Sequence, residues 1–135
     1  MDLLSIPNVV TDTLGINQTA QFIGKMMQKR GITPQYLDGY TKGMPPVVFG
    51  EVNVGAKETI VFYAHYDGQP VNPNNWAEGL HPFKPKLYNG SLDKGATAID
   101  FANVNGSFND DWRIYARSAS DDKGGVFIIL NAYDI

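Results

Sequence analysis

The sequence has 135 residues, of which 43% are hydrophobic, and it carries a formal net charge of −3. This length and composition suit one globular domain or a large piece of one. The Lys and Arg residues are scattered and give no basic field, so we expect no nucleic-acid partner. Because the chain has no cysteine, it can form no disulfide, and any transition metal must be held by His and carboxylate side chains.

No apolar run in the sequence approaches the ~20 residues that are needed to span a bilayer. The N-terminus has an early acid, Asp2, and no basic region, so it does not read as a secretory signal. We therefore expect no membrane partner and, by default, a cytoplasmic location.

The first half of the chain predicts one helix and two strands. Residues 17–30 have apolar side chains at helical spacing, and Gly31 is placed to end that helix. Residues 47–52 and 59–64 predict strands. The second of these is apolar almost without alternation, so we expect it to be covered on both faces of a sheet.

The second half is less regular. Residues 69–111 are rich in Pro, Asn and Gly, and we expect them to contain short strands at 84–88 and 98–101 and to line a substrate entrance. Residues 112–116 predict a short buried strand and residues 124–133 an apolar helix. That helix runs into the end of the sequence without a cap, which favours an incomplete domain.

The first segment that could carry chemistry is residues 65–70, with the sequence HYDGQP. Side chains two apart on a strand point the same way, so Asp67 can lie beside His65. A carboxylate bonded to one imidazole nitrogen leaves the other nitrogen free for a metal. Taken alone, this pair favours a simpler interpretation, in which an acid merely satisfies a His at the end of a strand.

The second segment is residues 119–125, with the sequence ASDDKGG, immediately before the last predicted helix. Ser and Asp at this position are preferred N-cap residues, and a cap alone would explain one of them. Two adjacent acids exceed what a cap needs. One carboxylate could therefore turn towards a cation, while Gly124 and Gly125 let the helix approach the sheet closely.

Together the two segments resemble the N-terminal signatures of the dinuclear zinc peptidases. This family includes carnosinase-type dipeptidases, glutamate carboxypeptidases, aminoacylases and succinyl-diaminopimelate desuccinylases. The resemblance extends over essentially the whole chain, because residues 4–9 resemble the opening loop of the family. Residues 69–72 and 76–87 resemble its dipeptidase-like branch in particular.

The resemblance implies an α/β fold, with residues 1–135 as the incomplete N-terminal part of a zinc-exopeptidase-like catalytic domain. Its central mixed sheet would be flanked by helices, and the lid or dimerisation domain would be absent. The resemblance also implies that His65 binds one zinc ion, that the catalytic Asp67 orients it, and that Asp121 bridges two zinc ions. The peptide bond between Asp121 and Asp122 would be cis.

The chain departs from the family pattern in two ways. The family usually has Gly-Arg-Gly before the second signature, where residues 116–118 here read Ala-Arg-Ser, which we interpret as a subfamily mark. The general-base Glu and the other ligands of the family follow the position of Asp121, whereas all three glutamates of this chain precede it. The resemblance therefore implies that this chain alone is inactive.

The function implied is metal-dependent hydrolysis of amide bonds in dipeptides, short peptides or N-acyl amino acids, with two Zn²⁺ ions per complete site. A homodimer is one assembly that the resemblance allows for the full-length protein. The alternative is a non-catalytic metal-binding or partner-binding module of the same origin. A serine hydrolase is disfavoured because the sequence has no Gly-x-Ser-x-Gly elbow.

Overall fold

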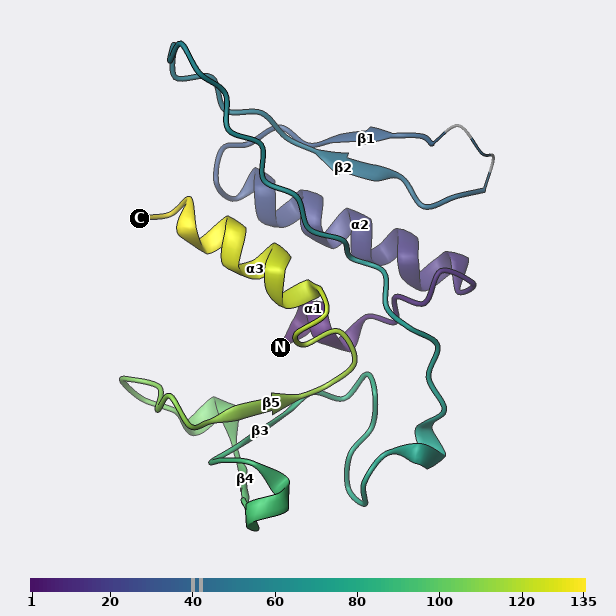
Figure 1. Cartoon of the computed structure of the whole chain (residues 1–135), viewed down its shortest axis with the longest axis vertical. Helices are drawn as coiled ribbons and strands as arrows, with labels where there is room; N and C mark the ends of the chain where they lie inside the picture. Colours follow the sequence, from purple (N-terminus) through teal and green to yellow (C-terminus); the bar gives the residue numbers. More distant parts are fainter. Residues whose placement is uncertain (40, 42) are drawn as a thin grey trace.

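The computed structural model describes residues 1–39, 41 and 43–135 of the chain, which form a mixed α/β structure (Figure 1). The α/β class is thereby confirmed. The helices and strands of the described residues are α1 (Asp2–Ser5), α2 (Thr13–Gln28), β1 (Gln35–Leu37), β2 (Val47–Phe49), β3 (Lys86–Tyr88), β4 (Ala98–Ile99), β5 (Arg113–Tyr115) and α3 (Lys123–Ala132).

Helix α2 is the longest element, and it begins at Thr13 rather than at residue 17 as predicted. The reason is an N-cap: the Asp12 side chain accepts a hydrogen bond of 3.0 Å from the Gly15 backbone N–H. The helix ends at Gln28, and Gly31 takes the left-handed conformation expected after a helix end, with φ +75°. Its buried apolar residues repeat at helical spacing: Ile16, Ala20 and Ile23.

The hydrophobic core lies where α1, α2 and α3 meet, and Figure 1 shows α3 running beside α2. Each large apolar side chain buried there stabilises the fold by about 1.5–3 kcal/mol. The core is small. Among the described residues, the cluster that connects the three helices has four buried members: Leu3, Ile23, Val126 and Leu130.

The strands form two separate antiparallel sheets rather than the single mixed sheet that the family resemblance implies. One sheet pairs β1 with β2, with Tyr36 opposite Val48. In the other, β3 is central, and its buried Leu87 lies opposite Ile99 of β4 and Ile114 of β5. Figure 1 shows the helices between these two sheets.

The prediction of a buried strand at residues 59–64 is wrong. In the described part of the chain, this segment pairs with no strand, and its four central side chains are 71–84% exposed. Its apolar composition favours burial, but a β-strand also needs a neighbouring strand about 4.8 Å away with which to form backbone hydrogen bonds. No described strand lies in that position, so His65 follows an extended segment rather than the end of a sheet strand.

The strands expected at 84–88, 98–101 and 112–116 are present with shorter bounds as β3, β4 and β5. The last predicted helix corresponds to α3, which begins and ends one residue earlier than predicted. Strand β5 is less buried than expected, since Ile114 is 43% exposed. Among the described residues, no helix combines the length and apolarity that a bilayer crossing requires.

Arg30 joins the C-terminal ends of α2 and α3, and we expect its loss to destabilise the fold. Its guanidinium donates to the Leu130 carbonyl at 2.9 Å and to the Asn131 side chain at 3.0 Å, and it pairs with Asp134 at 2.6 Å. Arg30→Met leaves these acceptors without their donor and should lower the free energy of unfolding by about 1–3 kcal/mol. Urea unfolding measures this change.

The control for this measurement is Lys29→Met, which changes an exposed cation one position earlier in the chain. It should change the free energy of unfolding by no more than about 0.5 kcal/mol. Equal effects of the two substitutions would contradict the assigned role of Arg30.

Candidate metal site

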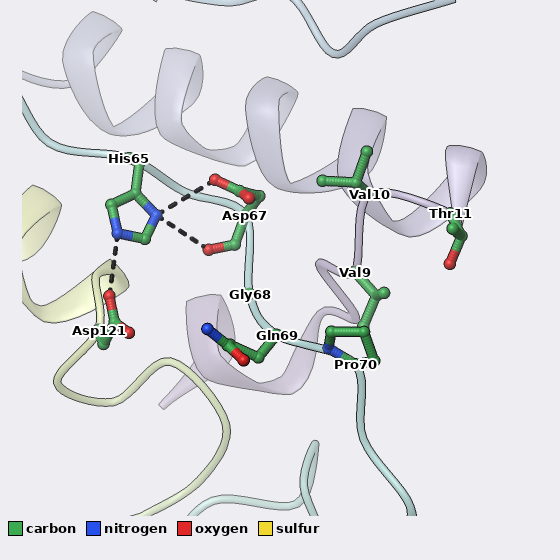
Figure 2. A pocket seen from close by; sticks show the side chains of 9 residues that line it. All are labelled: Val9, Val10, Thr11, His65, Asp67, Gly68, Gln69, Pro70 and Asp121. Carbon is green, nitrogen blue, oxygen red and sulfur yellow. Dashed lines mark hydrogen bonds and ion pairs between the residues drawn. The ribbon is translucent and has the colours of Figure 1, made fainter.

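Three side chains singled out from the sequence meet in the structure (Figure 2). His65 Nδ1 lies 3.1 Å from Asp67 Oδ1 and 3.1 Å from the Asp67 carbonyl oxygen. On the other side of the ring, His65 Nε2 lies 2.9 Å from Asp121 Oδ1. The fold therefore brings together residues that are 56 positions apart in the chain.

The hydrogen-bond partners of the His65 ring indicate which of its two nitrogens are protonated. Both atoms near Nδ1 of His65 are acceptors, so Nδ1 carries a proton. Nε2 faces a carboxylate oxygen of Asp121, which can accept a hydrogen bond from a protonated Nε2. Burial lowers the pKa of His65, but the hydrogen bonds that the ring donates to the Asp67 carbonyl and to the Asp121 and Asp67 carboxylates outweigh burial. The pKa of His65 therefore lies above its ordinary value.

The two adjacent acids before α3 have different roles. Asp122 is the N-cap, because its Oδ1 accepts a hydrogen bond of 3.1 Å from the Gly125 N–H. Its Oδ2 also accepts a hydrogen bond of 3.2 Å from the His65 backbone N–H. Asp121 is left free to face the imidazole. The expected cap is confirmed, as is the cis peptide bond between the two residues. That Asp121 turns towards a cation stays a prediction.

The glycines after these acids are explained by the loop rather than by a sheet. A Cβ at Gly124 would lie 2.5 Å from the Ala119 carbonyl oxygen, and a Cβ at Gly125 would collide with the capping carboxylate of Asp122. The expectation that they let the helix approach a sheet is wrong. They let the helix begin directly against the loop that carries Asp121.

The N-terminal segment supports both loops of the site. Gly68 pairs with Val9 in a parallel bridge, and its N–H donates to the Asn8 carbonyl at 2.9 Å. At the start of α3, the fully buried Lys123 Nζ donates to the carbonyl oxygens of Leu3 at 2.8 Å and Ile6 at 2.6 Å. Burial lowers the pKa of Lys123 to about 8. The two carbonyl groups partly replace the water that its ammonium group loses.

The site faces a cleft of about 430 Å³. Figure 2 shows His65 and Asp121 at one end of this cleft and Val10, Thr11 and Pro70 at the other. The side chains of His65 and Asp121 are 40% and 73% exposed, so both can be reached from solvent. An ion pair this exposed contributes about 1 kcal/mol or less to stability.

The donor atoms fit one edge of a zinc site, although they do not complete it. Imidazole nitrogen and carboxylate oxygen are zinc ligands, and two ligands of one tetrahedral zinc lie about 3.3 Å apart, close to the observed 2.9 Å between His65 Nε2 and Asp121 Oδ1. A catalytic zinc usually has three protein ligands. Within residues 1–39, 41 and 43–135, no group of three or more His, Cys, Asp or Glu residues is placed to hold a metal.

Comparison with known proteins gives one informative match. Over 143 aligned positions the chain is 28% identical to the Cys-Gly metallodipeptidase dug1 of Schizosaccharomyces pombe. The alignment covers 97% of this chain and 25% of the relative, so the chain spans about a quarter of the length of that curated protein. No family model and no solved structure matches significantly. The similarity supports a relationship with dipeptidase-like metallopeptidases.

The residues that support the site could not be identified from the sequence. Asn8, Ser118 and Lys123 are buried polar residues whose partners lie far away along the chain. The sequence did indicate that position 118 is unusual, because glycine is common there in the family. Ser118 has φ +63°, in the left-handed region that glycine favours, so this departure leaves a strained backbone.

Gly68 is required for the two loops to approach each other, and we expect Gly68→Ala to disturb their packing. A Cβ at this position would lie 2.5 Å from Ser118 Oγ and 3.0 Å from the Asn8 amide. The substitution should lower the free energy of unfolding by about 1–3 kcal/mol, measured by urea unfolding. Adding Ser118→Gly removes the nearest atom and should restore part of the loss.

The control for this substitution is Gly90→Ala. An added Cβ there makes only an ordinary contact of 3.7 Å with Ala96. If Gly68→Ala were as well tolerated as Gly90→Ala, the close approach of the two loops would not be a constraint on the fold.

Proposed function

We propose that this chain supplies His65 and Asp121 to the dinuclear zinc centre of a dipeptidase-like metallopeptidase. The convergence of His65, Asp67 and Asp121 on one cleft carries the proposal. The similarity to a metallodipeptidase supports it from a separate direction. The remaining ligands and the general base would come from residues outside this sequence, because two ligands are fewer than a catalytic zinc needs.

Each of the three residues has a distinct role in this proposal. His65 would bind one zinc through Nε2, and Asp121 would bridge both ions. Asp67 would hold the Nδ1 proton of His65, which fixes the tautomer and the orientation of the ring. Bound zinc ions polarise a carbonyl group and make water a nucleophile near neutral pH.

The substrate class that we propose is a dipeptide, a short peptide or an N-acyl amino acid. The polar end of the cleft, where His65 and Asp121 lie, would receive the scissile amide. The apolar side chains of Val9, Val10 and Pro70 would contact the substrate side chain. For the complete protein, a homodimer remains a prediction.

Zinc binding tests the first part of the proposal. We expect Zn²⁺ to perturb the His65 ring resonances of the isolated chain. His65→Ala or Asp121→Asn should weaken zinc binding by more than about tenfold. Removing a residue that only hydrogen-bonds to a metal ligand already weakens binding by about that much, and removing the ligand itself should weaken it further. Isothermal titration calorimetry and NMR of the imidazole protons measure the affinity.

The chain offers a matched control, because it contains two histidines. His81 lies outside the site and its Nδ1 accepts a hydrogen bond of 3.2 Å from the Phe83 N–H. His81→Ala should leave zinc affinity unchanged. Equal binding by wild type and His65→Ala would exclude His65 as a ligand.

Hydrolysis tests the second part of the proposal. With Cys-Gly as the substrate and added Zn²⁺, the isolated chain should release amino acids no faster than His65→Ala does, because the general base is missing. Product release is measured by chromatography. Turnover by the wild-type chain above that of His65→Ala would refute the claim that further residues are needed.

A further inference from the structure

The two proposed zinc ligands lie in loops that no common sheet or helix fixes. His65 precedes the bridge at Gly68, and Asp121 lies in the loop before α3. The contact between their side chains is exposed and contributes little to stability. One hydrogen bond of 3.2 Å, from the His65 backbone N–H to the Asp122 carboxylate, joins the two loops directly. A buried residue that contacts both loops would add to this link.

Asn8 is positioned to do so on the His65 side. It is 0% exposed, and its Nδ2 donates a hydrogen bond of 2.7 Å to the Tyr66 carbonyl. Its backbone carbonyl accepts a hydrogen bond of 2.9 Å from the Gly68 N–H. Asn8 therefore binds the backbone on both sides of Asp67.

The same amide group reaches the other loop. Asn8 Nδ2 also donates a hydrogen bond of 2.9 Å to Ser118 Oγ, three positions before Asp121. Both N–H bonds of the Nδ2 group are thus used, one to each loop. Among the described residues, Asn8 Oδ1 is buried without a partner, although an unpaired acceptor costs about 1–3 kcal/mol. The fold keeps an amide here for its two donors.

We infer that Asn8 is a positioning residue, which links the loop of His65 to the loop of Asp121 and sets the separation of the two side chains for a divalent cation. The inference rests on the proposed zinc role of these side chains. Asn8 touches neither the ion nor the substrate in this scheme and acts through the Tyr66 carbonyl and Ser118.

The first test needs no metal. In the zinc-free chain, a nuclear Overhauser effect between the His65 ring Hε1 and the Asp121 Hβ protons reports their contact. Asn8→Ala should weaken this signal strongly, because only the hydrogen bond from the His65 N–H to the Asp122 carboxylate would still join the loops. Ser118→Ala, which removes only one acceptor, should weaken it less. Thr19→Val is the matched control, because Thr19 is also 0% exposed and its Oγ1 donates to Gly15 O within α2 and to Pro7 O. It should leave the signal intact.

The second test is zinc affinity, followed through the same ring resonances. Asn8→Ala should weaken binding about tenfold, as expected for outer partners of metal ligands, and Ser118→Ala should weaken it less. Thr19→Val should bind as the wild type does. If Asn8→Ala does not fold, Ser118→Ala decides alone, and unchanged contact and affinity in that variant would overturn the inference.

The outcomes separate the two proposals. If Thr19→Val loses the contact as Asn8→Ala does, Asn8 acts only through general stability and the inference is wrong. If the contact depends on Asn8 while Zn²⁺ leaves the His65 resonances of the wild type unchanged, the positioning by Asn8 stands and the zinc role fails.

Discussion

The N-terminal segment, residues 3–9, is the part of the structure on which the candidate site depends. The loop of His65 is bonded to it through Asn8, and the helix that follows Asp121 is bonded to it through Lys123. Because these contacts are buried, they act in a low dielectric, where a hydrogen bond is stronger and an unpaired group is costly. Two loops that share no sheet are thereby held against one common support.

Among the described residues, more large apolar side chains are exposed than are buried in the core. Residues 60–63 stand largely in solvent. Residues 61–63 line one side of a groove of about 500 Å³ that reaches Ile23, Val126 and β2. The site lies next to this groove, since His65 and Asp67 line both hollows.

The sequence predicts those parts of the structure that depend on residues close together in the chain better than those that depend on residues far apart in the chain. Helices α2 and α3 were predicted because an amphipathic or apolar period is a local signal, and β3, β4 and β5 followed from short runs between turn residues. The segment 59–64 was misassigned because its composition specifies burial but cannot specify a partner strand. The start of α2 was missed because Asp12 was not recognised as its cap.

The same distinction applies to the site. His65, Asp67 and Asp121 were selected by resemblance, and the structure brings all three together, although spacing alone could not place residues 56 positions apart side by side. Asn8 was not selected, because its bond to Ser118 joins positions 110 apart and has no local signature.

Stability and chemistry are consequently assigned to different residues in this chain. The exposed contact of His65 with Asp121 adds little to the free energy of folding, so these residues can present their lone pairs to a cation without weakening the fold. The buried hydrogen bonds of Asn8 and Lys123 stabilise the two loops without involving the side chains of His65 and Asp121. An imidazole and a carboxylate that lie 2.9 Å apart and that the fold does not need for stability fit the metal role that we propose for them.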